Sequence, residues 1–218
     1  MKLLNKKIHI SCDGGAATGK STGAKMIAKK YKLKFLSSGL LYRYAAFLLI
    51  KHKPKNKISF LKKKFKNLNY KKINIINLHT PEISEKTSNI AKINRIRKIL
   101  KTFQEKFSNK FKNCCIDGRD ISTKILPDSD VKFFFKCNLN TAALRRYKEL
   151  KKKDNKIKFK DVKKALRIRN NHDIKRRFSP LLKHRDAIEI DTSKLNKQAM
   201  LVKMSKHVDK VIKKKYGN

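Results

Sequence analysis

The stretch whose residue types and spacing most directly imply chemistry lies near the start of the chain. It reads Gly14-Gly15-Ala16-Ala17-Thr18-Gly19-Lys20-Ser21-Thr22, which fits the pattern G-x-x-x-x-G-K-[ST] of phosphate-binding loops. A polyphosphate needs several backbone N–H groups aimed at one point, and glycine lets the backbone come close enough to supply them. In this pattern Lys20 can reach a transferred phosphate, and the hydroxyl of Ser21 can ligate Mg²⁺. We therefore predict a phosphate-binding loop over residues 14–22.

The segments on either side of this loop have the character that the motif requires. Residues 8–12 read as a short buried strand entering the loop. Residues 20–31 read as a helix leaving it, with Ala24, Ile27 and Ala28 on one face. A glycine turn that arose by chance would not need a strand before it and a helix after it, so the context favours the functional interpretation.

A second candidate site follows a later predicted strand. Cys114-Cys115-Ile116 leads directly into Asp117-Gly118-Arg119-Asp120. Parallel α/β sheets carry their ligands at the carboxyl ends of the strands. The chain has only 16 acidic residues against 59 basic ones, so two acids beside an arginine are informative. We interpret this segment as part of a site, with a charged turn as the alternative.

Arginine is also scarce, because only 11 of the 59 basic residues are arginine. Its planar fork grips phosphates and base edges in a way that lysine cannot. Arg169, Asp173 and Arg176 are spaced by four and three residues, which places them on one helix face. Such a row can bind a sugar hydroxyl and phosphates together. A helical salt-bridge ladder fits the same spacing equally well.

Four other polar residues lie on predicted helices. Ser38 is a predicted N-cap of a helix that runs to about residue 50, which places Arg43 on the second turn. A cation and a helix end can together hold a phosphate, although a surface arginine fits equally well. Ser88 and Arg97 lie on helices predicted over residues 80–93 and 95–107, and on the sequence alone both read as surface residues.

The order of predicted elements defines the fold class. Strands over residues 8–12, 33–37, 114–116, 131–135 and 187–190 alternate with helices, which predicts one α/β domain over residues 1–218 with a central parallel sheet flanked by helices. Residues 51–80 are lysine-rich and predict a small mobile insert, with a helix over 60–68 and a strand over 73–78. Residues 151–160 are polar and predict a flexible lid.

The net charge of +43 bears on partners and location. Such a charge is typical of proteins that bind nucleic acid or membrane surfaces. Here lysine is spread along the whole chain, which favours a compositional bias with solvated lysines, and an RNA-binding phosphate-loop protein stays the alternative. No apolar run approaches the ~20 residues of a membrane span. The start lacks a signal peptide, and the four cysteines lack zinc spacing, so we expect a cytosolic protein with reduced cysteines.

Together these motifs resemble one family, the bacterial cytidylate kinases, which are nucleoside monophosphate kinases. The phosphate-binding loop alone is shared by many families. The segment from Asp117 to Asp120 followed by the later Arg/Asp/Arg row is specific, and the resemblance covers nearly the whole chain. It is carried by Asp13-Gly14, Gly19-Lys20-Ser21-Thr22, Ser38-Gly39, Tyr42-Arg43, Asp117-Gly118-Arg119-Asp120, Arg145-Arg146-Tyr147, Arg169, Asp173, Arg176, Ser179-Pro180-Leu181 and Asp191-Thr192-Ser193.

The resemblance implies a fold, a reaction and a set of roles. The fold would be that of a phosphate-loop kinase, with residues 51–80 as a small subdomain for the nucleoside monophosphate and 151–160 as the lid. The reaction would move the γ-phosphoryl group of ATP to CMP or dCMP, in pyrimidine nucleotide metabolism. Residues 14–22 would bind ATP, with Mg²⁺ at Ser21 and with Lys20 and Arg145 as catalytic cations.

The resemblance also implies the residues that bind CMP. Ser88, Arg97 and Asp120 would read the cytosine edge. Arg169 and Asp173 would serve the ribose and phosphates. Three arginines, Arg43, Arg119 and Arg176, would clamp the monophosphate, and Ser38 would also bind CMP. We expect a monomer without a specific nucleic-acid partner, and a phosphate-loop kinase for a different acceptor stays the second alternative.

Overall fold

The computed structural model describes residues 7–152 and 154–217. Contacts divide the chain into two compact units, each of which is described by itself. The first, called the sheet unit, comprises the residues up to Phe35 and those from Lys112 onward. The second, called the helical unit, comprises residues Leu36–Phe111.

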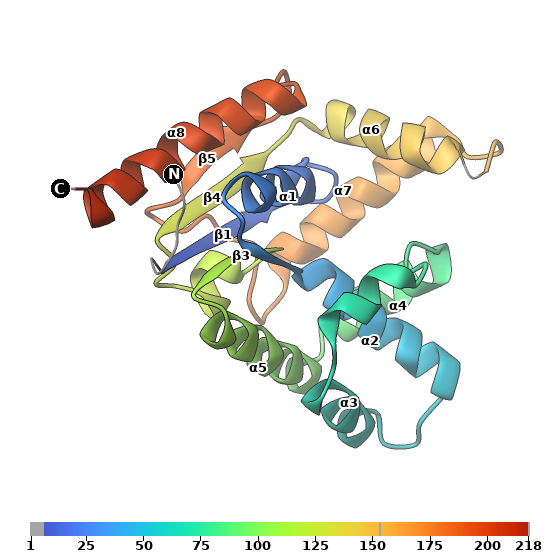
Figure 1. Ribbon diagram of the computed structural model, residues 1–218. Coiled ribbons are helices and arrows are strands. Elements are labelled where there is room, and N and C mark those ends of the chain that lie inside the picture. The colour runs from blue at the N-terminus through green and yellow to red at the C-terminus, as the bar shows by residue number, and fades with distance from the viewer. Residues whose placement is uncertain (1–6, 153, 218) are drawn as a thin grey trace. The chain divides into compact units, whose positions relative to one another are not determined.

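A five-stranded sheet has the strand order β2-β3-β1-β4-β5 (Figure 1). The central strand β1 is buried along its whole length and pairs in parallel with β3 and β4, so that Ile10 lies opposite both Cys115 and Val131. Strand β5 pairs in parallel with β4. The predicted parallel sheet is confirmed. The strands are β1 (Ile8–Gly14), β2 (Lys34–Ser37), β3 (Asn113–Gly118), β4 (Val131–Lys136) and β5 (Ile188–Asp191).

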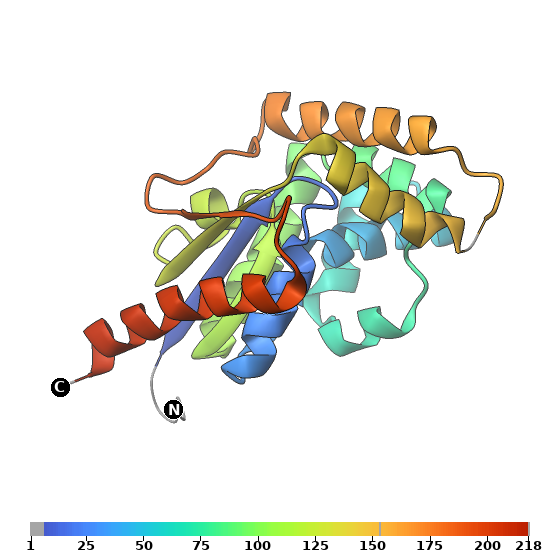
Figure 2. The same ribbon diagram turned by 90° about the horizontal axis from the view of Figure 1, so that it is seen from above.

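Two helices of the sheet unit, α1 (Lys20–Lys30) and α8 (Lys197–Tyr216), pack against each other and against the strands (Figure 2). Their apolar residues join strand residues in one buried cluster, with Ile27 from α1, Phe133 and Phe135 from β4, and Met204 and Val208 from α8. The periodicity that predicted both helices therefore corresponds to one shared core. This core fixes the start of α1, which is where the phosphate-binding loop ends.

Gly23 shows how closely α1 approaches its neighbours. A Cβ atom at this position would lie 2.9 Å from two ring carbons of Phe135 and 3.1 Å from Sδ of Met204. We expect Gly23→Ala to lower the free energy of unfolding by about 1–2 kcal/mol, because overpacking costs more than the gain in helix propensity returns.

The matched control for this change is Gly39→Ala, another glycine within a helix. Its nearest neighbour would be Ser37 Oγ at 3.8 Å, which leaves room for a methyl group. Urea unfolding should therefore show Gly39→Ala at or above wild-type stability. Equal effects of the two changes would contradict close packing at Gly23.

Helices α6 (Leu139–Lys151) and α7 (Phe159–Lys175) form an antiparallel hairpin in the sheet unit (Figure 2). Asn138 caps α6 by accepting a hydrogen bond from the N–H of Thr141 at 2.7 Å. The hairpin packs on Ala16 of the phosphate-binding loop through Val162 and Leu166. The predicted lid, residues 151–160, falls at the turn of this hairpin, except that residue 153 lies outside the described residues. Its movement stays a prediction.

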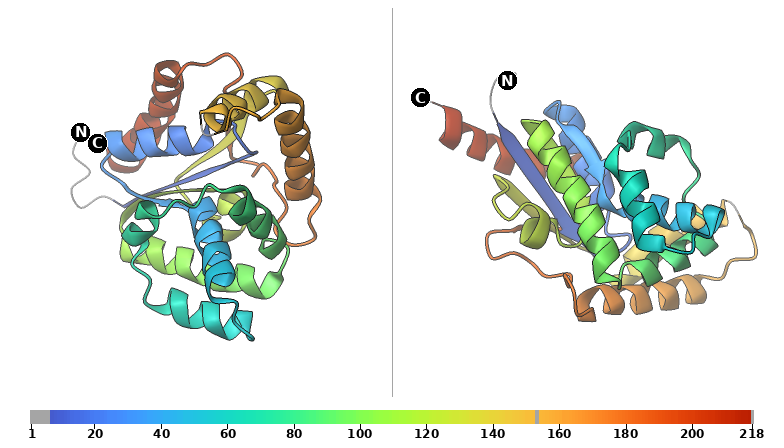
Figure 3. Two further views of the ribbon diagram at one scale, coloured as in Figure 1. Left: turned by 90° about the vertical axis from the view of Figure 1, so that its right-hand side faces the viewer. Right: turned by 90° about the horizontal axis from the view of Figure 1, so that it is seen from below.

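The helical unit contains four α-helices and one 3-10 helix among its described residues (Figure 3). Helix α2 contacts α4 and α5, and α3 packs on α5 through Phe65 and Phe103, whose rings meet edge to face at 5.8 Å. Thr80 caps α4 with Pro81 in its first turn, as predicted. The helices are α2 (Ser38–His52), α3 (Lys57–Lys66), η1 (Tyr70–Ile75), α4 (Pro81–Ile90) and α5 (Asn94–Lys110).

Two local predictions for this unit are wrong. The strand predicted over residues 73–78 is replaced by η1 over Tyr70–Ile75. The side chain of Asn69 accepts a hydrogen bond from the N–H of Lys71, which starts this turn, and Tyr70 packs edge to face on Phe107 at 5.0 Å. The N-cap of α2 is Ser37, not Ser38, which is the first helical residue. Residues 51–80 lie within the helical unit, and their role as a separate mobile insert stays a prediction.

The cysteines carry free thiols. Cys12 on β1 and Cys115 on β3 are buried with their sulfur atoms 4.0 Å apart, Cys114 is also buried, and Cys137 is partly exposed. Burial raises the pKa of the Cys114 thiol to about 12. Among the helices of residues 7–152 and 154–217, none is both long and apolar enough to cross a membrane.

Candidate active site

The phosphate-binding loop connects β1 to α1 at the carboxyl end of the central strand. Gly14 passes so close to β4 that a Cβ atom would lie 2.5 Å from the carbonyl oxygen of Phe135. Gly19 is the N-cap of α1 and has a φ of 78°, which is the left-handed region that glycine tolerates best. Both glycines of the motif are therefore required by the backbone path, as the sequence predicted.

Lys20 and Ser21 meet one carboxylate at the base of this loop. Lys20 is only 7 % exposed, and its Nζ lies 3.0 Å from Oδ2 of Asp117. The hydroxyl of Ser21 donates a hydrogen bond to the same oxygen. Burial lowers the pKa of Lys20, and the negative charge of Asp117 acts in the opposite direction. Asp117 reaches this place because β3 lies beside β1, where it pairs with Cys12.

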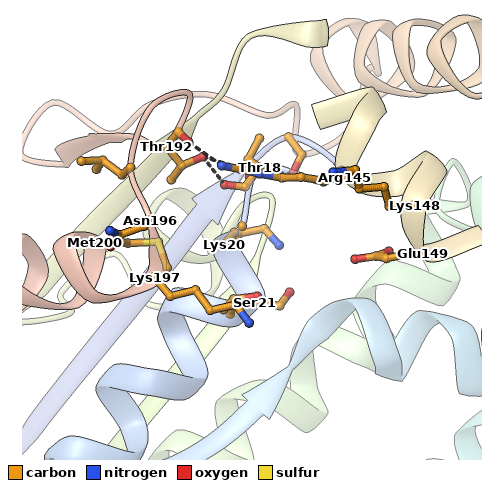
Figure 4. Close-up of a pocket in the computed structure, with 15 residues that line it drawn as sticks. Thr18, Lys20, Ser21, Arg145, Lys148, Glu149, Thr192, Asn196, Lys197 and Met200 are labelled. Atoms are coloured by element: carbon orange, nitrogen blue, oxygen red, sulfur yellow. Dashed lines mark hydrogen bonds between the residues drawn. The ribbon is translucent and has the colours of Figure 1, made fainter. Parts of the chain in front are cut away.

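A cavity of about 690 Å³ opens in front of the loop (Figure 4). Arg145 of α6 lines it beside the loop and is held by Thr192, with Nη1 donating to Oγ1 at 3.0 Å and Nη2 donating to the carbonyl oxygen at 2.6 Å. The structure thus brings Lys20, Ser21 and Arg145 to one cavity. The lining consists of Gly15, Ala17, Thr18, Gly19, Lys20, Ser21, Thr22, Arg145, Lys148, Glu149, Thr192, Leu195, Asn196, Lys197 and Met200.

A second constellation in the sheet unit, called the arginine cluster, consists of Arg119, Asp120, Arg169, Asp173 and Arg176. Nε of Arg119 lies 2.7 Å from Oδ2 of Asp173. Nη1 of Arg176 lies 3.4 Å from Oδ1 of Asp173, and its Nη2 lies 3.9 Å from Oδ1 of Asp120. Arg169 also acts electrostatically on Asp173. All five sequence-predicted residues of this group lie in the same unit.

The prediction that Arg169, Asp173 and Arg176 all lie on one helix face is wrong for Arg176. Arg169 and Asp173 lie on α7, whereas Arg176 is the C-cap of that helix and has extended backbone geometry. It reaches Asp173 from beyond the helix end and also donates a hydrogen bond to the carbonyl oxygen of Ser179. Asp173 thus interacts with Arg169 and Arg176 as a salt-bridge row would, and Arg119 and Asp120 join this row from the turn after β3.

Asp13 fixes the turn that carries Arg119 and Asp120. Its buried carboxylate accepts hydrogen bonds from the N–H of Ile121 at 2.8 Å, the N–H of Ser122 at 2.7 Å and the hydroxyl of Ser122 at 2.6 Å. These donors start η2 (Ile121–Ile125), a π-helical turn. Asp13 directly precedes the phosphate-binding loop, so one side chain holds the turn of the arginine cluster to the strand that carries the loop.

In the helical unit, Arg43 and Ser88 meet around Ser84. Arg43 is 7 % exposed, and its Nη1 donates to the carbonyl oxygen of Leu78 and to Oγ of Ser84, each at 2.9 Å. Ser88 lies one turn later on α4 and donates to the carbonyl oxygen of Ser84 at 3.2 Å. The alternative that Arg43 is an ordinary surface residue is therefore wrong.

Arg97 is also buried, at 6 % exposed. Its guanidinium lies 5.5 Å from the centre of the Tyr42 ring, and Nη1 donates to the carbonyl oxygen of Ala91 at 3.2 Å. The interpretation of Arg97 as a surface residue is wrong for the same reason as for Arg43. Ser38, at the start of α2, is buried as well.

Asp173 gives the arginine cluster a measurable pH dependence. Burial raises the pKa of this carboxyl, but the guanidiniums of Arg119, Arg169 and Arg176 outweigh burial and hold the pKa below its ordinary value. The stabilisation is thus complete above the unfolded-state pKa of about 4 and is lost as the pH falls through the lower folded-state value. We expect Asp173→Asn to flatten the fall in unfolding free energy below about pH 4.

Urea unfolding at a series of pH values measures this effect. Asp128→Asn changes an exposed carboxylate and is the control, which should keep the wild-type slope. An Asp173→Asn curve parallel to that of the wild type would contradict the stabilised carboxylate.

Comparison with known proteins decides the family. The sequence model described as cytidylate kinase matches residues 10–210 of the chain. The chain belongs to the cytidylate kinase family. It is 37 % identical to a cytidylate kinase of Bartonella tribocorum, over 95 % of this chain and 97 % of that protein. It is 35 % identical to one of Fusobacterium nucleatum, over 94 % and 98 % of the two chains, and 33 % identical to one of Clostridium tetani, over 97 % and 98 %.

Solved structures share the fold of this cytidylate kinase family member. An uncharacterized protein of Eubacterium ventriosum matches with a TM-score of 0.56 at 16 % identity, over 93 % of this chain and 99 % of that one. The protein TT1252 of Thermus thermophilus matches with a TM-score of 0.52 at 14 % identity, over 94 % and 97 %. At these identities the similarity describes the fold alone.

Three residues of this cytidylate kinase family member have roles that the sequence did not assign to them. Asp117 joins Lys20 to Ser21, Asp13 holds the turn after β3, and Thr192 holds Arg145. The scarcity of acids pointed to the segment that contains Asp117, and an acid within an apolar strand was a comparable signal for Asp13. Thr192 was marked only as part of Asp191-Thr192-Ser193, a segment that carries the resemblance, and no role was attached to it.

Proposed function

We propose that the protein transfers the γ-phosphoryl group of ATP to CMP or dCMP, giving ADP and CDP or dCDP. One observation carries the proposal most directly: Lys20 of the phosphate-binding loop and Arg145 of α6 line the same cavity in a member of the cytidylate kinase family. Two cations beside a phosphate-binding loop suit a reaction whose charge spreads over the moving phosphoryl group.

The proposed catalysis consists of alignment and charge neutralisation. The loop N–H groups of residues 14–22 bind the ATP phosphates, while Lys20 and Arg145 stabilise the charge that develops during in-line transfer. Both side chains are held in advance, Lys20 by Asp117 and Arg145 by Thr192. Such preorganisation lowers the cost of ordering them in the transition state. The reaction needs no dedicated general base.

The residues at the base of the loop fit Mg²⁺ as the companion of ATP. Mg²⁺ prefers oxygen ligands and commonly takes few protein ligands beside phosphates and water. Ser21 offers a hydroxyl oxygen, and the carboxylate of Asp117 accepts a hydrogen bond from it. We assign Ser21 as the ligand and Asp117 as the group that orients it. The ion supplies positive charge at the phosphates when it is bound.

We propose that the arginine cluster is the part of the CMP-binding site that the sheet unit supplies. Asp173 is an ionised acceptor suited to ribose hydroxyls, with Arg169 beside it for ribose and phosphate. Arg119 and Arg176 are forked donors suited to the CMP phosphate, and Asp120 is suited to the amino group of cytosine. The contacts of Asp173 with both arginines support this proposal, because they hold the donors ready for an anion.

In the helical unit, we assign Ser38 and Arg43 to the CMP phosphate, and Ser88 and Arg97 to cytosine. The burial of both arginines supports the assignment, because a buried guanidinium is costly unless it is paired or serves a ligand. We further propose that residues 51–80 and the lid at 151–160 move to exclude water during transfer. The protein is proposed to act in the cytoplasm as a monomer, without a specific nucleic-acid partner.

A coupled assay of ADP release with ATP and Mg²⁺ tests the function, with CMP, dCMP, UMP, AMP and dTMP as acceptors. Turnover with CMP and dCMP alone is the expected result. Turnover with another acceptor would contradict the cytosine-reading roles of Ser88, Arg97 and Asp120 and favour the second kinase alternative. No turnover in folded protein, with tight and steeply salt-dependent RNA binding, would favour the RNA-binding alternative.

A further inference from the structure

The hydroxyl of Thr192 lies between the phosphate-binding loop and Arg145 (Figure 4). Its Oγ1 donates a hydrogen bond to the carbonyl oxygen of Thr18 at 2.8 Å and accepts one from Nη1 of Arg145 at 3.0 Å. The hydroxyl has one proton to donate, and the carbonyl oxygen of Thr18 is a closer acceptor for it than that of Lys136 at 3.2 Å. Its lone pairs stay available to accept the bond from Arg145, so the bonds to Thr18 and from Arg145 form at once. The side chain is 2 % exposed, so water does not compete for these bonds.

Thr192 is itself fixed by the sheet. It directly follows β5, and its N–H donates to the carbonyl oxygen of Lys136 at the end of β4, at 2.9 Å. Its own carbonyl oxygen accepts a bond from Nη2 of Arg145 at 2.6 Å. The β-branched side chain has few rotamers, so a fixed backbone also fixes the hydroxyl. Thr192 therefore links the rigid sheet by hydrogen bonds to Thr18 of the loop and to Arg145, both of which line the cavity.

The two groups are those that must act together on the transferred phosphate. The carbonyl of Thr18 belongs to the peptide that leads into Gly19, whose left-handed conformation turns the chain into Lys20. Holding this carbonyl sets the direction of the last loop N–H groups and of Lys20. The same hydroxyl sets the place of the Arg145 guanidinium. A misplacement of about 1 Å can cost about 100-fold in rate.

We propose that Thr192 is a positioning residue for phosphoryl transfer, which places the phosphate-binding loop and Arg145 relative to each other through its hydroxyl. The proposal rests on the proposed function and adds to it a residue that acts through the loop and through Arg145. A threonine that merely braced the fold would affect stability, whereas a positioning threonine affects ATP binding and turnover in fully folded protein.

Two substitutions separate the hydroxyl from the shape of the side chain. Thr192→Val keeps the branched shape and removes the hydroxyl, and Thr192→Ser keeps the hydroxyl and removes a methyl group. We expect Thr192→Val to lower kcat about 10- to 100-fold and to weaken ATP binding severalfold, with the KM for CMP little changed. Thr192→Ser should restore most of both. Thr102→Val, the same change at an exposed threonine of α5, should resemble the wild type.

A second background tests the link to Arg145. If Thr192 acts partly through this guanidinium, Thr192→Val should cost clearly less in an Arg145→Ala protein than in the wild type. Thermal unfolding and circular dichroism show that each variant is folded, and calorimetry with ATP in the absence of an acceptor measures the binding step alone.

The outcomes separate this inference from the proposed function. Wild-type kcat and ATP affinity in folded Thr192→Val protein would overturn the inference. A loss of kcat in Thr192→Ser as large as that in Thr192→Val would also overturn it, as would an equally large loss of kcat when Thr192→Val is made in the Arg145→Ala protein. Absence of CMP turnover in the wild type would overturn the proposed function. If the wild type does not phosphorylate CMP, ATP binding still tests the link between Thr192 and the loop. Weaker ATP binding in Thr192→Val but not in Thr192→Ser would support this link, and unchanged ATP binding in Thr192→Val would overturn it.

Discussion

Replacement of Lys20 by methionine is expected to lower kcat for phosphoryl transfer by about 100- to 1000-fold. Methionine has a similar length but no charge, so the change removes the buried cation of the phosphate-binding loop itself. Charge on the moving phosphoryl group would then lack one of its two preorganised partners. Initial rates with saturating ATP and CMP measure the effect.

The substitution also leaves the buried Asp117 without its cation, which can lower stability by about 3–5 kcal/mol. The double variant Lys20→Met with Asp117→Asn removes both charges and is expected to recover stability but not turnover. Lys25→Met, an exposed position on the same helix, is the control and should keep wild-type kcat and stability. Wild-type kcat in folded Lys20→Met protein would remove Lys20 from the catalytic role.

Replacement of Arg176 by alanine is expected to lower kcat/KM for CMP by about 100-fold or more without unfolding the chain. The guanidinium of Arg176 lies within 4 Å of both Asp120 and Asp173. Its loss removes a forked phosphate donor and an ion-pair partner of Asp173. Arg176→Lys keeps the charge but not the fork and should recover only part of the loss.

The neighbouring residue supplies the matched control. Arg177 is exposed and lies over the ring of Phe178 with its guanidinium carbon 5.5 Å from the ring centre. Arg177→Ala should therefore have wild-type kinetics and stability. An unchanged turnover rate and CMP KM in Arg176→Ala would remove Arg176 from the acceptor site.

The correct predictions concern features that are determined by residues close together in the sequence. The spacing of glycines, lysine and serine defined the loop, because each residue serves its own stretch of backbone. The five strands and their parallel sheet also followed from alternating apolar runs and helical periods, whereas the spatial order of the strands comes from the structure alone. The scarcity of arginine pointed to the arginine cluster, because a forked donor is retained where lysine cannot replace it.

What the sequence missed depends on contacts between distant segments. Asp117 meets Lys20 only because β3 lies beside β1, and Thr192 meets Arg145 across 47 residues of chain. The burial of Arg43 and Arg97 follows from packing within the helical unit, which a one-dimensional pattern does not contain. The strand predicted over residues 73–78 is wrong for a similar reason. Its apolar residues fit a strand pattern, but Tyr70 packs on Phe107 and stabilises a 3-10 helix there instead.

The arrangement of the cysteines has a consequence for how the protein withstands oxidation. Thiolates, not thiols, are the species that oxidants and alkylating agents attack. Cys12, Cys114 and Cys115 are buried in β1 and β3, and burial raises the pKa of Cys114 to about 12. In the folded chain these three sulfurs are therefore shielded sterically, and the raised pKa values of Cys114 and Cys115 also keep those two thiols protonated. Peroxide or an electrophile would reach Cys137 first, so the strand that leads into the phosphate-binding loop is protected for as long as the sheet stays closed.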